Sequence, residues 1–128
     1  MIDIVNITKR FGKFTALSGM NFSVGCSSIY GLVGYNGAGK TTLLKTVSGV
    51  YKPEEGEVRI DGENIFDNAK MKQRLFYVPD DLYFQPYASM EKMARFYKGY
   101  YPKFSDKTFQ NLTKVFGLDP TKRINGFS

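Results

Sequence analysis

Apolar and polar residues alternate in the first quarter of the chain, and helical repeats follow towards its C-terminal end. Ile2, Ile4 and Ile7 predict an opening strand, and the apolar positions within residues 17–24 predict a second one. The basic, glycine-containing segment 9–13 predicts the turn between them. Two strands joined in this way favour a small antiparallel layer at the start of the chain.

Two short apolar runs, residues 29–33 and 75–78, predict buried strands of a parallel sheet. The first run leads into a glycine-rich loop. Residues 43–47 after that loop have helical spacing, and Gly49 stands where a C-terminal cap is expected. The order strand, loop, helix and strand indicates an α/β fold.

The remaining pattern predicts smaller elements. Residues 57–60 alternate before an Asp-Gly pair, which predicts a hairpin, and Asp67 is expected to cap a short helix. Further along, Ser89 and Ser105 each precede an amphipathic helical pattern. The Asp-Pro pair at 119–120 predicts the start of a third short helix.

Composition limits the classes of protein that this chain can represent. Its 128 residues, 42% of them hydrophobic, suffice for one domain, and no apolar run is long enough to cross a membrane. One cysteine, Cys26, and no histidine exclude a disulfide framework and remove the commonest general base. The net charge of +6 is scattered rather than gathered in a block, so we expect solvated faces, and nucleic acid is not an expected partner.

Residues 34–42 read Gly-Tyr-Asn-Gly-Ala-Gly-Lys-Thr-Thr and match the phosphate-binding pattern G-x-x-x-x-G-K-[ST]. Chance would give this match in roughly one of a few hundred chains of this length, which disfavours the alternative of a plain glycine-rich surface loop. Glycines let backbone N–H groups approach an anion, and the helix that follows adds its positive end. The predicted nucleotide-binding residues of the loop are Gly34, Asn36, Gly37, Ala38, Gly39, Lys40, Thr41 and Thr42.

Within this loop, three residues have distinct expected roles. Lys40 is placed to reach the β- and γ-phosphates of a nucleoside triphosphate, and the Thr41 hydroxyl is suited to bind Mg²⁺. Thr42 would offer a hydroxyl near the α-phosphate. An ordinary threonine at a helix start is the equal alternative for Thr42.

Several segments together resemble the ATP-binding subunit of an ABC transporter. Residues 7–12 are similar to the opening of that family, in which an aromatic residue stacks on adenine, and Phe11 holds this position. The loop 34–42 resembles the family's Walker A loop, with Tyr35 where proline is usual. Residues 56–62 match the characteristic segment that follows it, and the resemblance extends along the whole chain.

Residues 77–80 resemble the family's Q-loop, in which a glutamine touches Mg²⁺ and the attacking water and relays the nucleotide state to the membrane subunit. Asp80 stands at this position. A carboxylate is an oxygen ligand for Mg²⁺ but adds negative charge near the γ-phosphate. The resemblance implies a metal-binding role for Asp80 and favours the exporter branch; Asp81 and Gln85 are alternatives, as is a loop acid that never meets the metal.

Residues 122–128 resemble the lead-in to the family's signature motif, with Phe127 and Ser128 standing for its first two residues. The resemblance therefore implies a P-loop NTPase core with a small N-terminal antiparallel β layer and the start of a helical subdomain, truncated before the signature motif. We expect residues 1–83 to form the first half of the nucleotide-binding core and residues 84–128 to begin the helical subdomain.

The resemblance also implies a function: binding of ATP and Mg²⁺ and, in the intact protein, coupling of ATP hydrolysis to transmembrane export. The implied partners are a membrane-spanning transporter subunit and a second nucleotide-binding domain. The implied location is cytoplasmic and peripheral, on the inner face of the cell membrane. The chain alone is expected to hydrolyse ATP poorly. Two alternatives stay open: a soluble ABC-superfamily ATPase acting on the ribosome or nucleic acid, and a silent fragment that binds nothing.

Overall fold

The structure, a computed structural model, describes residues 1–80 and 84–126. It divides into two compact units, Met1–Tyr77 and Val78–Ser128, and each is described by itself. The predicted domain boundary between residues 83 and 84 adjoins residues that lie outside the described ranges, so it stays a prediction. The same holds for Phe127 and Ser128 of the predicted signature motif.

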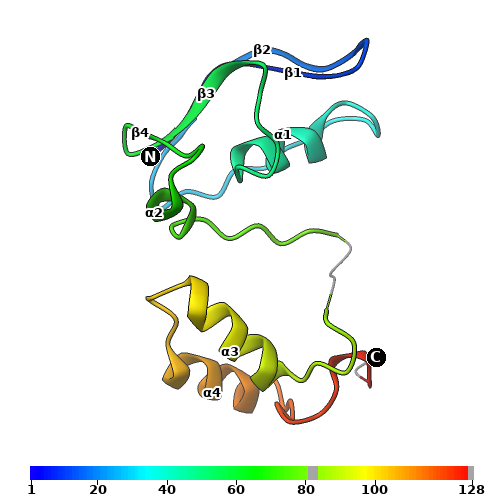
Figure 1. The fold of residues 1–128 in the computed structure, drawn as a ribbon, viewed down its shortest axis with the longest axis vertical. Coiled ribbons are helices and arrows are strands. Elements are labelled where there is room, and N and C mark those ends of the chain that lie inside the picture. The colour runs from blue at the N-terminus through cyan, green and yellow to red at the C-terminus, as the bar shows by residue number, and fades with distance from the viewer. Residues whose placement is uncertain (81–83, 127–128) are drawn as a thin grey trace. The chain divides into compact units, whose positions relative to one another are not determined.

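A four-stranded antiparallel sheet dominates the first unit (Figure 1), with the order β2-β1-β3-β4. Its strands are β1 (Ile2–Phe11), β2 (Phe14–Val24), β3 (Glu55–Ile60) and β4 (Glu63–Asn64). A two-residue turn joins β1 to β2, with Phe11 opposite Phe14. The antiparallel layer predicted from the alternating pattern is confirmed.

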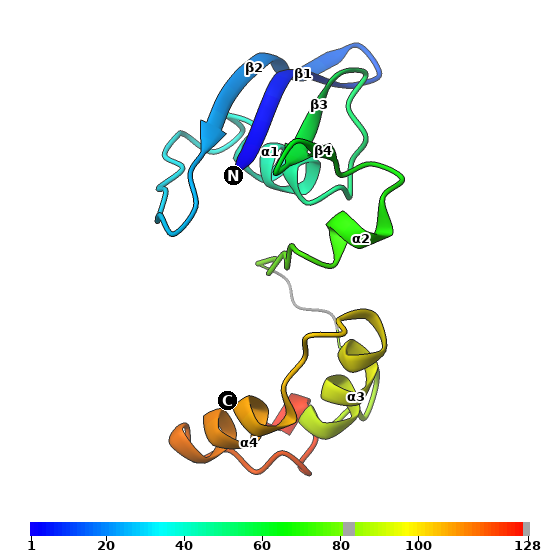
Figure 2. The same ribbon diagram turned by 90° about the vertical axis from the view of Figure 1, so that its left-hand side faces the viewer.

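Two helices accompany the sheet, α1 (Lys40–Val47) and α2 (Ala69–Lys72). Figures 1 and 2 both place α1 along one face of the sheet, where Leu43 joins the core. The helix is short, and its apolar positions recur at helical spacing, so burial of this stripe rather than intrinsic propensity stabilises it. The buried core consists of Ile4, Ile7, Leu17, Leu43, Val58, Ile60, Ile65 and Met71.

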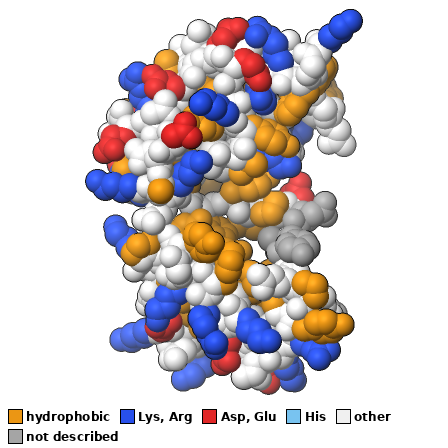
Figure 3. Space-filling view, viewed as in Figure 1, with side chains coloured by type: hydrophobic (Ala, Val, Ile, Leu, Met, Phe, Trp, Pro, Cys, Tyr) orange, Lys and Arg blue, Asp and Glu red, His pale blue; other side chains and the backbone are white. Residues whose placement is uncertain are grey.

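The two predicted parallel strands are not formed, and this part of the sequence prediction is wrong. Residues 29–33 and 75–78 have no strand assignment; Val33 is 95% exposed and Phe76 is 56% exposed. A parallel strand needs neighbours for its hydrogen-bond ladder. The sheet of the first unit pairs only antiparallel strands, so these runs have no strand partner in it; most of their side chains are exposed, while Leu75 packs against the core. Exposed apolar side chains, orange in Figure 3, occur on both units.

The cap of α2 also differs from the prediction. Asn68, not Asp67, is the N-cap: its Oδ1 accepts a hydrogen bond from the Met71 backbone N–H at 3.2 Å. Asp67 has a left-handed backbone with φ of 57°, whereas a capping residue needs the extended conformation that Asn68 has.

The second unit contains α3 (Met90–Tyr100), α4 (Asp106–Val115) and the short 3-10 helix η1 (Ile124–Gly126). Both predicted caps are confirmed, because the hydroxyls of Ser89 and Ser105 accept backbone N–H groups of the first turns at 3.3 and 3.1 Å. The predicted helix at 119–120 is wrong. The Asp119 carboxylate instead accepts from the Thr121 N–H and hydroxyl, which forms a local turn.

Candidate nucleotide-binding site

The glycine loop of residues 34–39 leads directly into α1. The Ala38 N–H donates to the Tyr35 carbonyl at 3.1 Å, which closes a turn inside the loop. Gly37 and Gly39 have left-handed backbones with φ of 85° and 91°, and Gly39 is the N-cap of α1 without a side-chain cap. The first N–H groups of a helix lack intrahelical partners. The loop therefore ends in backbone donors that point out of the start of α1.

Close packing explains why position 39 must be glycine. A Cβ on Gly39 would lie 2.7 Å from the Ala16 carbonyl oxygen and 3.2 Å from Cδ2 of Leu17. Both residues belong to β2, so the absent side chain lets the start of α1 approach the sheet. A Cβ on Gly34 would lie 3.3 Å from Cβ of Ala38, so the loop is also tightly folded on itself.

The ammonium group of Lys40 lies over this loop. Its Nζ donates to the carbonyl oxygens of Gly34 and Tyr35 at 2.6 and 2.8 Å. Backbone N–H donors, a mobile ammonium group and a helix N-terminus are the groups that bind a phosphate chain. The donor set of the loop thus fits the triphosphate that the sequence predicts.

The two threonines after Lys40 begin the helix. Thr41 is exposed in the first turn, so its hydroxyl is accessible to a cation beside the phosphates. Thr42 is half-buried, and its carbonyl accepts the hydroxyl of the buried Thr46 at 2.8 Å. In the described residues no group of three or more Cys, Asp or Glu side chains could hold a metal ion.

Phe11, the predicted adenine-stacking residue, ends β1 and is 44% exposed. Its ring centroid lies 5.4 Å from that of Tyr51 at an interplanar angle of 76°, an edge-to-face contact. The Lys9 Nζ lies 5.4 Å from the same Phe11 ring. Sequence reasoning missed Tyr51, which follows α1 and has no pattern around it that marks a nucleotide site.

Asp80 is exposed and belongs to the second unit, whereas the glycine loop belongs to the first. Its predicted role at the metal therefore stays a prediction. Asp81, one of the alternatives, lies outside the described residues. Gln85, the other, belongs to the second unit, and its backbone carbonyl accepts the Ala88 N–H at 2.9 Å.

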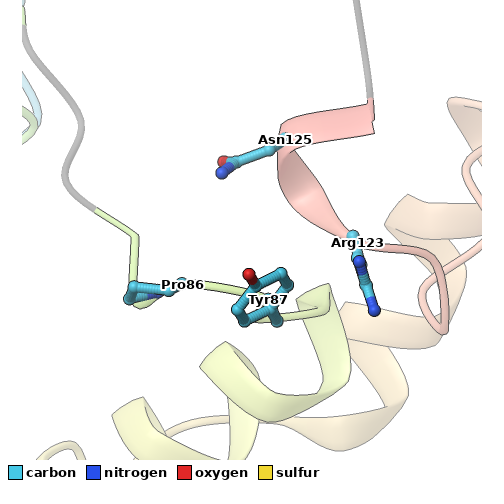
Figure 4. Close-up of a pocket in the computed structure, with 4 residues that line it drawn as sticks. All are labelled: Pro86, Tyr87, Arg123 and Asn125. Atoms are coloured by element: carbon cyan, nitrogen blue, oxygen red, sulfur yellow. The ribbon is translucent and has the colours of Figure 1, made fainter.

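The second unit has a pocket of about 450 Å³ that the sequence did not predict (Figure 4). It is lined by Pro86, Tyr87, Arg123 and Asn125, and the Arg123 guanidinium lies 4.7 Å from the centre of the Tyr87 ring. An antiparallel bridge between Ser89 and Arg123 fixes the two segments that carry these residues. A guanidinium stacked on a ring can still donate hydrogen bonds through its edge.

Within the described ranges, no helix is both long and apolar enough to cross a membrane. The antiparallel layer, the glycine loop and the helix that follows it define a P-loop NTPase. The chain belongs to the ABC transporter family, whose model matches residues 17–126. The family and the fold class predicted from the sequence are therefore confirmed.

The relatives of this chain include ATP-binding proteins of import systems and of a probable multidrug transporter. The chain is 30% identical over 122 residues to the probable multidrug ABC transporter ATP-binding protein YbhF of Escherichia coli, covering 92% of this chain and 21% of that protein. It is 46% identical over 68 residues to the arabinose import ATP-binding protein AraG of Vibrio parahaemolyticus, covering 53% of this chain and 13% of that protein. The chain thus spans about a fifth or less of these two relatives.

Solved structures agree on the fold. An ATP-binding subunit of an ABC transporter superposes with a TM-score of 0.87 and 21% identity, covering all of this chain and 56% of the other. At this identity the likeness concerns the fold alone. It extends over both units of the chain, including the helices of the second.

Proposed function

We propose that the chain binds ATP together with Mg²⁺ as part of the nucleotide-binding subunit of an ABC transporter. The observation that carries the proposal is the loop ahead of α1. There, Gly37 and Gly39 have left-handed backbones, Gly39 caps the start of α1, and Lys40 places its ammonium group over the same loop. Membership of the family supports ATP as the nucleotide.

Each residue of the site has a separate role in this proposal. The backbone N–H groups from Asn36 to Thr42, apart from that of Ala38, which donates to the Tyr35 carbonyl, would bind the phosphates together with the Lys40 ammonium, because they concentrate positive potential at one point. Thr41 would hold Mg²⁺, which neutralises charge on the phosphate oxygens. Phe11 would stack on the adenine. Asp80 would approach the metal or orient the attacking water, as the Q-loop resemblance implies.

We further propose that the intact protein couples ATP hydrolysis to export. The position of Asp80 in the resemblance supports the exporter branch, and the match to a multidrug protein over most of the chain agrees with it. Most of the named relatives are import proteins, among them the arabinose protein and a sulfate/thiosulfate import protein that is 36% identical over 74% of this chain, and these are the contrary indication. The proposed partners are a membrane-spanning subunit, docked on residues 84–117, and a second nucleotide-binding domain, with the protein peripheral on the inner face of the membrane.

Turnover by this chain alone should be slow. Its sequence contains no histidine. It also contains no segment that resembles the family's Walker B strand, whose catalytic glutamate activates water. Positioning of the phosphates by Lys40 and the loop would remain. Binding and hydrolysis are therefore expected to be separable in this chain.

The direct test measures binding of ATP with Mg²⁺ by titration calorimetry. Lys40→Ala should bind at least about tenfold more weakly, a difference of about 1.4 kcal/mol. Lys70→Ala is the charge-matched control, because Lys70 lies on the exposed surface of α2, away from the loop. Equal affinities of the Lys40→Ala and Lys70→Ala variants would refute the proposal.

The same variants test hydrolysis. Phosphate release by the unmodified chain should be slow and should fall further in Lys40→Ala. Lys40-dependent turnover as fast as that of an intact ABC ATPase would contradict the expected separation of binding from hydrolysis.

A further inference from the structure

Tyr51 lies in the connection between α1 and β3 and is fixed to the end of α1. The backbone N–H groups of Val50 and Tyr51 both donate to the Lys45 carbonyl, at 2.9 and 3.1 Å. The Lys45 ammonium lies 5.5 Å from the centre of the Tyr51 ring, within the range of a cation–π contact. Backbone and side chain of Tyr51 are therefore both held by the last turn of the helix.

The ring of Tyr51 reaches from this position to Phe11 at the end of β1. The edge-to-face arrangement, with centroids 5.4 Å apart, is one of the two preferred geometries of an aromatic pair. Phe11 stands at the end of its strand, next to the turn at Gly12 with φ of 58°; Phe14 lies opposite it, and the Lys9 Nζ lies 5.4 Å from its ring centre. The residue Phe11 stays 44% exposed, so the contact with Tyr51 does not bury it.

A second set of contacts fixes the backbone beneath Phe11. The Glu54 carboxylate accepts the Lys9 ammonium and the Arg10 N–H, both at 2.6 Å. Lys9 also donates to the Lys52 carbonyl at 2.8 Å. The segment after Tyr51 thus holds the last residues of β1 in place, and the freedom left to Phe11 is mainly that of its side chain.

We propose that Tyr51 is a positioning residue for the nucleotide base. It holds the Phe11 ring in the orientation that presents its exposed surface for stacking. Because Tyr51 is also anchored to α1, it joins the base site at the end of β1 to the helix whose first turn binds the phosphates. This inference rests on the proposed function, since it assigns a base-stacking role to Phe11.

The test compares two probes, ATP and inorganic tripolyphosphate, each with Mg²⁺ and the full 128-residue chain. Tyr51→Leu removes the ring and keeps the backbone hydrogen bonds to Lys45. It should weaken ATP binding about three- to tenfold, in line with measured aromatic pairs, and leave tripolyphosphate affinity unchanged. Tyr51→Phe keeps the ring and should bind ATP like the unmodified chain. In a Phe11→Ala background, Tyr51→Leu should have no further effect.

Three results would overturn the inference, and they are distinguishable. If Phe11→Ala weakens ATP binding but Tyr51→Leu does not, Tyr51 does not position the ring, and the nucleotide site stands. If Tyr51→Leu weakens ATP and tripolyphosphate binding equally, its role is structural. If the unmodified chain binds neither probe, or if Lys40→Ala binds both as well as the unmodified chain, the proposed function fails and the role of Tyr51 fails with it.

Discussion

Replacing Gly39 by alanine is expected to force the glycine loop and the sheet apart. Gly39 has φ of 91°, and a Cβ there would lie 2.7 Å from the Ala16 carbonyl oxygen. This oxygen is backbone in β2, so it cannot rotate away as a flexible side chain would. The start of α1 must shift by several tenths of an ångström, or the strand must move.

Two separate costs add up at this position. A left-handed backbone costs an alanine about 1–2 kcal/mol relative to its preferred conformations. Overpacking against a closely packed neighbour costs about 1–3 kcal/mol. The Gly39→Ala variant should therefore lose about 2–5 kcal/mol of unfolding free energy, a large share of the total for a small domain.

Gly37 is the matched control in the same loop. Its φ of 85° carries a similar backbone cost, but an added Cβ would meet no described atom within 4 Å. Urea unfolding of both variants is measured without nucleotide and monitored by far-ultraviolet circular dichroism. Because the backbone cost is similar at both positions, the difference in unfolding free energy between the variants gives the steric cost. Gly39→Ala should be less stable than Gly37→Ala by about 1–3 kcal/mol, and the slope of unfolding free energy against urea concentration should be the same for both variants. Equal stabilities would show that the close approach of α1 to β2 does not explain the glycine.

Three further predictions concern the rest of the chain. Gly56→Ala should destabilise the sheet far more than Gly62→Ala in urea unfolding; both have positive φ, but only at Gly56 would a Cβ collide with the Val5 carbonyl. Hydrogen bonds from Lys9 and Arg10 hold the pKa of Glu54 below its ordinary value of 4.5. The stability that this carboxylate contributes should be complete above pH 4.5 and lost as the pH falls through the lowered pKa. The thermal unfolding midpoint of Glu54→Gln should therefore fall less between about pH 5 and pH 3 than the midpoint of the unmodified chain. Ser105→Ala should lower stability by about 1 kcal/mol through loss of the α4 cap, and an unchanged unfolding midpoint would contradict this.

Local signals in the sequence predicted the elements that depend on local interactions. The first two strands follow from alternation and a short turn, and the caps at Ser89 and Ser105 follow from hydroxyl side chains ahead of helical repeats. The apolar runs at 29–33 and 75–78 were misjudged for a different reason. An apolar run indicates a tendency to be buried, but a strand forms only where another strand pairs with it, and no local pattern reveals that partner.

The same distinction applies to the site. The glycine loop is continuous in sequence, so its spacing alone predicts which residues would bind a phosphate chain. Tyr51 meets Phe11 from forty residues further along the chain, and only the fold brings the two rings together. The Asp67 prediction failed by one residue, because backbone conformation decides which of two adjacent polar side chains caps α2.

The contacts of Lys40 affect how its substitution must be interpreted. Its ammonium donates to two carbonyls of the loop, so Lys40→Ala removes these hydrogen bonds as well as the proposed phosphate ligand. Any loss of loop order would lower ATP affinity in addition to the lost charge. The measured difference therefore combines the proposed contact between Lys40 and the phosphates with any change in the loop itself. Hydrogen exchange of residues 34–42 without nucleotide separates the two terms: unchanged protection in Lys40→Ala would assign the whole loss of affinity to the charge.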